Sequence, residues 1–294
     1  MKLSRLILPA FAAALTVAAQ AALAQPLVSA DWLRGKLDDA KVVVLDIRTA
    51  EKYAAGHVPG AIATDYEKSG WRVATSDGAG GALPPIDQVA ALIGGLGVAN
   101  DSHPVIAGDD FGAMARVYWT FKVLGHKDVS LLDGGWDGWR ADAADPVSTA
   151  PAKRPAVTFA ASYDASIRAE LPEVEKAVAT GSSKLVDARP PAQWNGTSKT
   201  SAVKALGHLP GAVWVDQTTA LSASSKLKSK SDLEKLFAAV GDDPAVTYCN
   251  TGHLAATDWF VLSEVLEKKS TKMYDGSMSQ WTADAARPMV IETK

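Results

Sequence analysis

The sequence contains only one cysteine and five histidines in 294 residues. A single cysteine excludes an internal disulfide framework and any zinc or iron–sulfur site built from several cysteines. Runs of basic residues are also missing, and 30 Lys and Arg against 33 Asp and Glu leave a formal net charge of −3. The chain therefore offers no electrostatic surface for nucleic acid.

Long apolar runs are missing everywhere except at the start of the chain. Residues 6–19 are almost entirely apolar, follow Lys2 and Arg5, and precede Ala-Leu-Ala at 22–24. This order is typical of a secretory signal peptide. A buried or membrane-anchoring helix is the alternative, but the run is short and lacks stop-transfer charges. We expect residues 1–24 to be removed, leaving a soluble, exported, periplasmic protein with no membrane anchor.

What remains is rich in core-forming residues, with 47% hydrophobic residues and nine tryptophans. This composition and length predict two domains of ordinary size and exclude a disordered or fibrous protein. Export also bears on the role of Cys249, the one thiol of the chain. An unpaired thiol in an oxidising compartment is exposed to damage unless it is buried or used, and composition alone does not choose between these roles.

The chain contains the same three signatures twice and in the same order. An apolar strand ending in Asp-x-Arg occurs at 42–48 and 185–189, and Gly-His-x-Pro-Gly-Ala occurs at 56–61 and 207–212. An Asp-Gly pair followed by Trp occurs at 133–139 and 275–281. We infer a duplication, with a first domain at 25–148, a Pro/Ala-rich extended linker at 149–162 and a second domain at 163–294.

Each copy alternates short apolar strands with helical patterns, which predicts an α/β fold with a mainly parallel sheet flanked by helices. In the second copy the pattern gives strands and helices in alternation. The expected strands are 184–187, 212–215, 245–248 and 272–274, and the expected helices are 231–240, capped by Ser231, and 255–266. Cys249 then lies at the carboxyl end of a strand, the edge where open α/β sheets usually carry their sites.

The segment that begins at Cys249 reads Cys-Asn-Thr-Gly-His-Leu, from 249 to 254. A strand–Cys–loop–helix arrangement can aim several backbone N–H groups at the sulfur, with the positive end of the helix dipole behind them. Such a cradle favours a thiolate and stabilises an anionic adduct on sulfur. Gly252 can adopt the positive φ that a tight cradle needs. The alternative is a buried strand-end cysteine followed by an ordinary turn.

These three signatures and the cysteine loop, in this order and spacing, resemble the rhodanese family, and the duplicated layout resembles its tandem-domain sulfurtransferases. The resemblance implies two tandem rhodanese-like domains, of which only the C-terminal one carries a nucleophile. Aligning Trp119 with Trp259 places Asp109 on Cys249, so the first domain is expected to be inactive.

The resemblance also implies a reaction. The Cys249 thiolate takes the outer sulfur of a donor such as thiosulfate, and a thiophilic acceptor, cyanide or a thiol, then takes it from the persulfide. The backbone of Asn250, Thr251, Gly252, His253 and Leu254 is expected to hold that persulfide. No cofactor or metal is implied. The partners are a small sulfur donor and an acceptor, the latter either small or a protein thiol.

Arg189 matches a family position that holds the anionic end of the donor, but it can equally pair with Asp187, as Arg48 in the first copy suggests. His253 is unusual in the loop. It either adds positive charge and orients the donor or is a surface residue at a helix start. His57, His208 and the repeated tryptophans recur in both copies and are expected to be structural. These tryptophans are Trp119, Trp139, Trp259 and Trp281.

The loop departs from both known substrate types. The thiosulfate type carries cations after the cysteine and the 3-mercaptopyruvate type carries small residues, whereas Asn250 and Thr251 are uncharged and polar. An arginine-rich stretch that follows Asp-x-Arg in the family is replaced here by Gln-Trp-Asn-Gly at 193–196. The sequence therefore leaves open whether thiosulfate or 3-mercaptopyruvate is the donor, and it leaves the oligomeric state open as well.

Other functions fit less well or remain open. A phosphatase or arsenate reductase needs Cys-x5-Arg, but Ala255 stands at the arginine position. A Cys–His hydrolase built from Cys249 and His253 lacks a third, orienting group. A non-catalytic sulfur carrier that accepts sulfur from a partner remains possible, as does a purely structural scaffold in which the thiol is unreactive.

Overall fold

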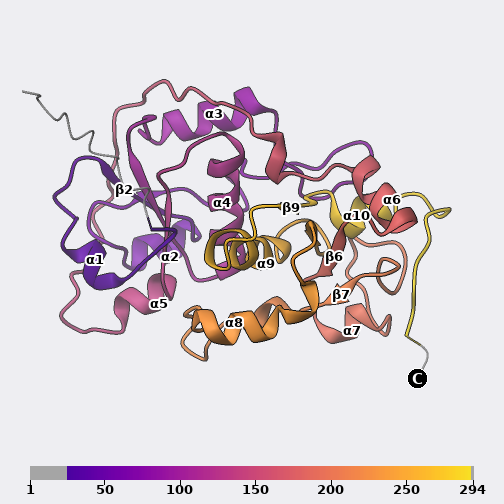
Figure 1. The fold of residues 1–294 in the computed structure, drawn as a ribbon. Coiled ribbons are helices and arrows are strands. Elements are labelled where there is room, and N and C mark those ends of the chain that lie inside the picture. The colour runs from indigo at the N-terminus through magenta and orange to yellow at the C-terminus, as the bar shows by residue number, and fades with distance from the viewer. Residues whose placement is uncertain (1–24, 293–294) are drawn as a thin grey trace, which may run out of the picture.

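The fold is described from a computed structural model, which places residues 25–292; the predicted signal peptide lies outside this range. Two parallel sheets form, one from each half of the chain (Figure 1). The sheet of the first half has the strand order β1-β5-β4-β2-β3, and that of the second half has the order β7-β6-β8-β9. Every paired strand is parallel to its neighbour, which confirms the predicted α/β class.

The first half alternates strands and helices, as the sequence predicts. The strands are β1 (Leu27–Val28), β2 (Val42–Asp46), β3 (Ile62–Ala63), β4 (His103–Ala107) and β5 (Ser130–Leu132), and the helices are α1 (Ala30–Arg34), α2 (Ala50–Ala55), α3 (Ile86–Gly95), α4 (Phe111–Val123) and α5 (Gly135–Arg140). The interior strand β2 contains an unbroken Val-Val-Val-Leu run and is almost entirely buried, as expected for a parallel strand that is covered on both faces and needs no polar side.

The second half repeats this order with more short helical turns. The strands are β6 (Lys184–Asp187), β7 (Val213–Trp214), β8 (Ala245–Tyr248) and β9 (Thr271–Met273), the α-helices are α6 (Leu171–Thr180), α7 (Pro191–Trp194), α8 (Lys230–Leu236), α9 (Ala255–Phe260) and α10 (Ser277–Trp281), and the other turns are η1 (Ala165–Ile167), η2 (Gln217–Ala220), η3 (Ala238–Val240) and the π-helical η4 (Val261–Val265).

The predicted helix cap at Ser231 is wrong. Helix α8 is capped by Ser229, whose Oγ accepts from the backbone N–H of Asp232 at 3.2 Å and donates to that side chain at 2.7 Å. The N-cap therefore lies two residues earlier than predicted, and Asp232 rather than Glu234 is the acid that pairs with it. The helix ends at Leu236 and tightens into the 3₁₀ turn η3, so the predicted single helix over 231–240 is two elements.

The segment between the halves contains no helix or strand and lies along the first domain. Its backbone is anchored by hydrogen bonds from Val157 N–H to Gly94 O and from Ser162 N–H to Leu124 O, both 2.9 Å. The side chain of Phe159 is buried against the core of the first half. The linker is therefore a packed strap rather than a free tether.

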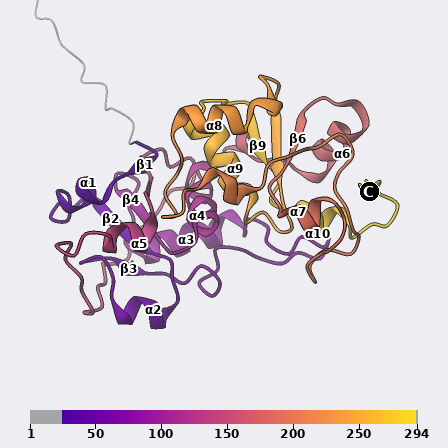
Figure 2. The same cartoon turned by 90° about the horizontal axis from the view of Figure 1, so that it is seen from below.

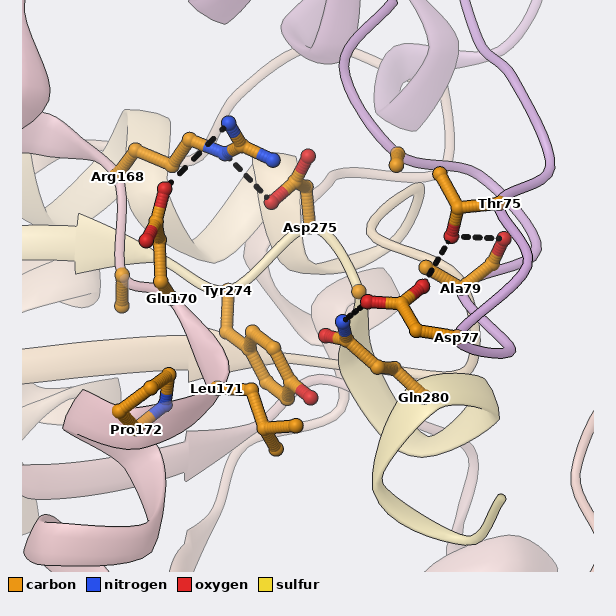
Figure 3. A pocket seen from close by; sticks show the side chains of 13 residues that line it. Thr75, Asp77, Ala79, Arg168, Glu170, Leu171, Pro172, Tyr274, Asp275 and Gln280 are labelled. Carbon is orange, nitrogen blue, oxygen red and sulfur yellow. Dashed lines mark hydrogen bonds and ion pairs between the residues drawn. The ribbon is translucent and has the colours of Figure 1, made fainter.

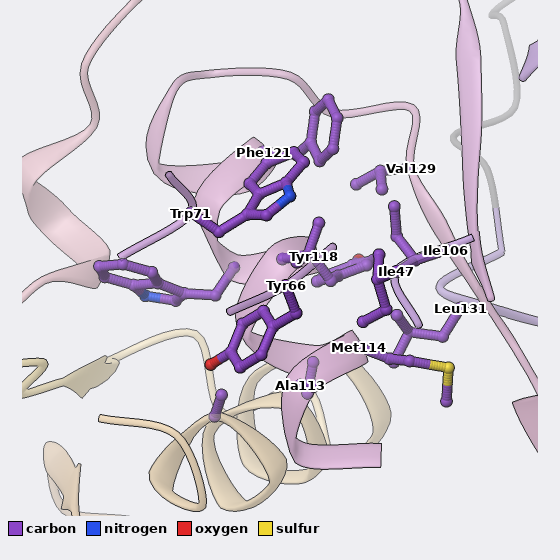
Figure 4. Close-up of a cluster of buried hydrophobic side chains, with 14 of the residues drawn as sticks. Ile47, Tyr66, Trp71, Ile106, Ala113, Met114, Tyr118, Phe121, Val129 and Leu131 are labelled. Atoms are coloured by element: carbon purple, nitrogen blue, oxygen red, sulfur yellow. The ribbon is translucent and has the colours of Figure 1, made fainter. Parts of the chain in front are cut away.

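The two halves share one hydrophobic cluster, built where α4 and α9 lie side by side (Figures 1 and 2). Phe260 on α9 makes edge-to-face contacts with Phe111 and Tyr118 on α4, with ring centroids 5.8 and 5.0 Å apart. Cys249 belongs to the same cluster. Figure 4 shows its first-domain part, with Met114 and Phe121 of α4 among the labelled side chains.

Residues that recur in both copies are structural, as expected. His57 stacks on Tyr53 with ring centroids 3.7 Å apart, and His208 stacks on Trp194 at 3.5 Å. Each of these histidines also hydrogen-bonds a backbone carbonyl through Nδ1 at 2.8 Å. The four repeated tryptophans are buried: Trp119, Trp139, Trp259 and Trp281.

Candidate active site

Cys249 directly follows β8 and is completely buried, with 0% of its surface exposed. Its backbone N–H donates to Ser277 Oγ at 3.1 Å, and its carbonyl accepts from Met278 N–H at 3.0 Å. Both partners belong to the first turn of α10. The cysteine backbone is thus fixed from two sides before the loop that follows it begins.

The loop after Cys249 presents unused backbone donors. In the described part of the chain, none of the N–H groups of residues 250–255 donates to a protein acceptor. The turn depends on Gly252, whose φ is +75°, a conformation that side chains other than glycine rarely adopt. A row of free N–H groups beside a thiol is an anion-binding arrangement, because each group is a donor in need of an acceptor.

The side chains of this loop are held by both halves of the protein. Asn250 Nδ2 donates to Gln193 Oε1 at 2.8 Å within the second half. Thr251 packs against the turn of the first half at Gly80 and Gly81, so closely that a Cβ on Gly81 would lie 2.4 Å from Thr251 O. Leu254 packs, partly buried, against the shared hydrophobic cluster. The loop is therefore covered on one side by the first domain.

His253 reaches into the first domain, although one prediction made it a surface residue at a helix start. Its Nε2 lies 3.1 Å from Asp110 Oδ1, and its Nδ1 lies 3.1 Å from the Tyr66 hydroxyl. Since an ionised carboxylate only accepts, Nε2 donates to Asp110, and Nδ1 forms the hydrogen bond with the Tyr66 hydroxyl. Only 21% of the His253 side chain is exposed. The histidine is a bridge between the domains.

The electrostatic partner of His253 also caps a helix. Asp110 accepts from the N–H of Ala113 at 2.8 Å in the first turn of α4. Burial raises the pKa of the Asp110 carboxyl, but the hydrogen bond and positive charge of His253, together with hydrogen bonds from the backbone N–H groups of Ala113 and Gly112, lower it more, so its net pKa lies below the ordinary value. Asp110 therefore stays ionised and holds the imidazole from the first domain.

Arg189 is engaged elsewhere. Its side chain is 1% exposed, and its Nε and Nη2 donate to both carboxylate oxygens of Asp187 over 2.6–3.1 Å. Nη2 also donates to Gly207 O at 2.8 Å. Arg48 makes the same pair with Asp46 in the first domain. Of the two roles expected for Arg189, the geometry favours the local pair over a donor-binding cation.

The register of the two sheets corrects the predicted alignment of the copies. Asp46 pairs with Ala107, and Asp187 pairs with Tyr248, so the residue equivalent to Cys249 is Gly108 rather than Asp109. The alignment on tryptophans was one residue off because Trp119 lies 12 residues after the end of β4 (119 − 107), whereas Trp259 lies 11 residues after the end of β8 (259 − 248). Gly108 has no side chain, so the first domain still lacks a nucleophile at this position.

Comparison with known proteins agrees with this geometry. The Rhodanese-like domain family model matches the chain twice, over residues 29–142 and 170–284. The chain belongs to the rhodanese family. A thiosulfate sulfurtransferase of Corynebacterium glutamicum is 32% identical over 268 residues, covering 87% of each chain. The sulfur carrier protein TtuD of Thermus thermophilus is 32% identical over 271 residues, covering 87% of this chain and 93% of that protein. Tandem rhodanese sulfurtransferases are thus its relatives.

Two solved structures share the fold. EanB in complex with ergothioneine has a TM-score of 0.80 at 18% identity, covering 92% of this chain and 71% of that chain. YnjE has a TM-score of 0.77 at 22% identity, covering 92% and 69%. At these identities the likeness concerns the arrangement of both rhodanese domains and not their substrates.

Three residues of this rhodanese site were not singled out from the sequence: Tyr66, Arg116 and Ser277. Tyr66 and Arg116 come from the first domain, more than 130 positions before the loop, and no local pattern marks them. Ser277 did carry a signal. It has φ +51° at the position where the first copy has Gly135, so a serine replaces a glycine in a left-handed turn. Its hydroxyl is the one that holds Cys249 N–H.

A cavity of about 340 Å³ opens beside the loop, between the first-domain turn at 75–82 and the second domain (Figure 3). Arg168 and Asp275 line it and form an ion pair of 3.0 Å, and the hydroxyl of Tyr274 is buried there without a hydrogen-bond partner among residues 25–292. Asp275 and Gly276 connect this cavity to the turn that holds Cys249. The cysteine itself does not line it.

Among residues 25–292, no three side chains of His, Cys, Asp or Glu come together in a way that could hold a metal ion. Within the same range, no helix combines the length and apolarity needed to cross a membrane.

Proposed function

We propose that this protein moves a sulfane sulfur from a donor such as thiosulfate to a thiophilic acceptor through a persulfide on Cys249. The observation that carries the proposal is the loop itself: one buried thiol at a strand end, followed by six consecutive N–H groups with no acceptor among the described residues. An anionic sulfur on Cys249 would supply that acceptor. Membership of the rhodanese family supports the same chemistry.

The first half-reaction loads the cysteine. The Cys249 thiolate attacks the outer sulfur of thiosulfate, a new S–S bond forms, and the original S–S bond breaks with its electron pair leaving on sulfite. Backbone donors that are already in place stabilise the charge as it develops on sulfur, without any reorganisation at that moment. Ser277 keeps the cysteine backbone in register with that cradle.

The second half-reaction removes the transferred sulfur from Cys249. A nucleophilic acceptor, cyanide or a thiolate, attacks the outer sulfur of the persulfide, and the electron pair of the S–S bond returns to Cys249 as a thiolate. Atoms and electrons balance without a metal or redox cofactor. Since both half-reactions use one sulfur atom at one site, donor and acceptor are expected to show ping-pong kinetics.

The charges beside the loop leave the donor class open, so the names of the relatives decide which donor we propose first. Asn250 and Gln193 form an uncharged amide pair there, and the charge of Arg189 is matched by Asp187. Thiosulfate is the donor we propose first, with 3-mercaptopyruvate as the alternative. Comparing loading rates with the two donors separates them.

A non-catalytic sulfur carrier is the second candidate. One observation favours it: one relative is named a sulfur carrier protein. A carrier would take sulfur from a protein partner and pass it to a protein thiol. It would not turn over with free thiosulfate and cyanide.

Export is part of the proposal. The first 24 residues have the order of a secretory signal, and we propose a periplasmic protein that handles sulfur compounds outside the cytoplasm. Mass spectrometry of the protein from a periplasmic extract tests this. A measured mass that matches a chain beginning at Gln25 supports export, and an uncleaved chain found in the cytoplasm contradicts it.

Steady-state turnover tests the enzyme against the carrier. Thiosulfate and cyanide are supplied to the wild-type protein and to Cys249→Ser, and thiocyanate is measured. Repeated turnover that is abolished in the variant, with its circular dichroism unchanged, supports the sulfurtransferase. Retained turnover in Cys249→Ser contradicts the assignment of the nucleophile, and no turnover in the wild type favours the carrier.

A further inference from the structure

Arg116 lies in the first domain, on α4, and its side chain is completely buried against the cysteine loop of the second domain. Its Nη1 donates to Gly252 O at 3.2 Å. Arg116 leaves no room for a side chain at this position, because a Cβ on Gly252 would lie 2.7 Å from the same nitrogen. The domain without a nucleophile therefore places a guanidinium directly behind the loop of the other.

The charge of Arg116 is only partly compensated, by a cation–π contact in which its Cζ lies 4.9 Å from the centroid of the Trp119 ring. Its Nε and Nη2 have no hydrogen-bond partner among the described residues. The nearest carboxylate oxygen, Oδ2 of Asp275, is 4.0 Å from Nη2 and already accepts from Leu83 N–H at 2.7 Å, while Oδ1 of Asp275 accepts from Arg168 at 3.0 Å. Burial lowers the pKa of Arg116, but a guanidinium keeps its charge. Buried positive charge with this little compensation stabilises an anion close by.

The hydrogen bond to Gly252 O also fixes a peptide plane. In a trans peptide, the carbonyl of one residue and the N–H of the next point in opposite directions. With Gly252 O held by Arg116, the N–H of His253 points away from the guanidinium. A glycine peptide flips at little cost, and a flipped plane would replace that donor with a carbonyl oxygen. Arg116 works against this flip.

We infer that Arg116 is a positioning residue for sulfur transfer, which fixes the Gly252–His253 peptide as an anion donor and adds positive charge behind it. The inference rests on the proposed persulfide of Cys249. It gives the first domain a part in the reaction, through a residue whose equivalent in the second domain, Ala256 on α9, has no charge.

The test compares three variants in the full-length mature protein. Arg116→Met removes the charge and the donor, Arg116→Lys keeps the charge, and Tyr118→Phe is the matched control. Tyr118 lies two residues further along α4 and donates across the same domain boundary to Glu264 at 2.8 Å, without touching the loop. Two rates are measured: sulfur uptake from thiosulfate by intact mass, and alkylation of Cys249 by iodoacetamide across a pH series.

We expect Arg116→Met to slow sulfur uptake about tenfold to a hundredfold, up to the effect of losing one backbone donor outright. We also expect the midpoint of its alkylation profile to move to higher pH. Arg116→Lys should restore much of both, and Tyr118→Phe should match the wild type. A folded Arg116→Met with wild-type uptake and a wild-type profile would overturn the inference.

Two complications have their own tests: a variant that does not fold, and a wild-type protein that takes up no sulfur. If Arg116→Met fails to fold, Arg116→Gln and Arg116→Lys are compared, and equal, wild-type profiles for both overturn the inference. If the wild type takes up no sulfur, the proposed function fails, whereas the alkylation profiles still report whether Arg116 stabilises the thiolate.

Discussion

Gly252 has two requirements at once, a left-handed backbone and the absence of a side chain. Its φ is +75°, and a Cβ would lie within 2.8 Å of Arg116 Nη1 and of Asp275 backbone atoms. Gly241 is the matched control, because it has φ +68° but nothing within 4 Å of a Cβ. The two glycines separate backbone strain from steric exclusion.

Gly252→Ala and Gly241→Ala should therefore differ. Each pays about 1–2 kcal/mol of left-handed strain in stability. Only Gly252→Ala must also displace Arg116 or the Asp275 turn, so it should lose more stability and nearly all sulfur uptake. Urea unfolding and intact mass after thiosulfate measure the two effects. Equal uptake by both variants would show that the loop tolerates a side chain and is not a tight cradle.

At the scale of single residues, the sequence predicts Cys249 as the nucleophile but does not predict which distant residues contact its loop. Cys249 and Gly252 stand out because their types and spacing are local. Arg116 and Tyr66 come into contact with the loop only when α4 and α9 cross, and a contact across so many residues leaves no local pattern. Arg189 was ambiguous for a related reason, since a guanidinium suits a donor anion and Asp187 equally until the distances are known.

Helix α9 shows how an element can be constrained on all sides. All six of its residues are buried, because one face lies on its own sheet and another lies on α4. Asp258 is among them, and neither of its carboxylate oxygens has a hydrogen-bond partner in the described range. Burial, and to a lesser extent the charges of Asp187 and Asp216, raises the pKa of Asp258 well above its ordinary value.

Because Asp258 on α9 has a raised pKa, we expect the stability of the folded protein to depend on pH. Below about pH 4 Asp258 is protonated in both the folded and the unfolded chain. Above that pH the unfolded chain releases the proton and the folded chain keeps it, so stability falls by up to about 1.4 kcal/mol per pH unit until the raised pKa is reached. Asp258→Asn does not titrate, and its free energy of unfolding relative to the wild type should rise between pH 5 and pH 8.

Urea unfolding at both pH values measures this difference. The control is Asp243→Asn, an exposed aspartate in the same domain, measured at the same two pH values. A pH-independent difference for Asp258→Asn would mean that Asp258 is ionised in the folded protein.

Element types were predictable from the sequence, but their ends were not. The strands of the second sheet were placed to within one residue, because short apolar runs between polar turns are a strong signal. The start of α8 was misplaced because both Ser229 and Ser231 have an acid three residues later, and a capping pattern alone cannot rank them. The end of α9 as a π-helical turn follows from packing rather than from local preference.

At the scale of the whole molecule, the two domains share a core rather than a simple contact. Phe260 packs on Phe111 and Tyr118, and the same cluster contains Cys249. We expect a single transition in calorimetry for the mature chain, and we expect Phe260→Ala to lower its stability by about 3–5 kcal/mol. Two resolved transitions in the wild type would contradict a shared core.

The duplication explains why only one half has a residue able to carry the proposed chemistry. The copies differ at two positions that touch each other: Gly108 with Gly135 in the first domain, and Cys249 with Ser277 in the second. A Cβ on Gly135 would lie 2.2 Å from Gly108 O, so the first copy is closed at this place. The first domain contributes instead by covering the loop and by supplying Arg116 and Asp110.

The central claim is that Cys249 carries the transferred sulfur. Its most direct test is intact-protein mass spectrometry of the reduced mature protein after brief exposure to thiosulfate, with Cys249→Ser measured in parallel. The account predicts a gain of one sulfur atom in the wild type, reversed by cyanide and absent from the variant. An equal gain in the variant, or no gain in the wild type with either thiosulfate or 3-mercaptopyruvate, would contradict it.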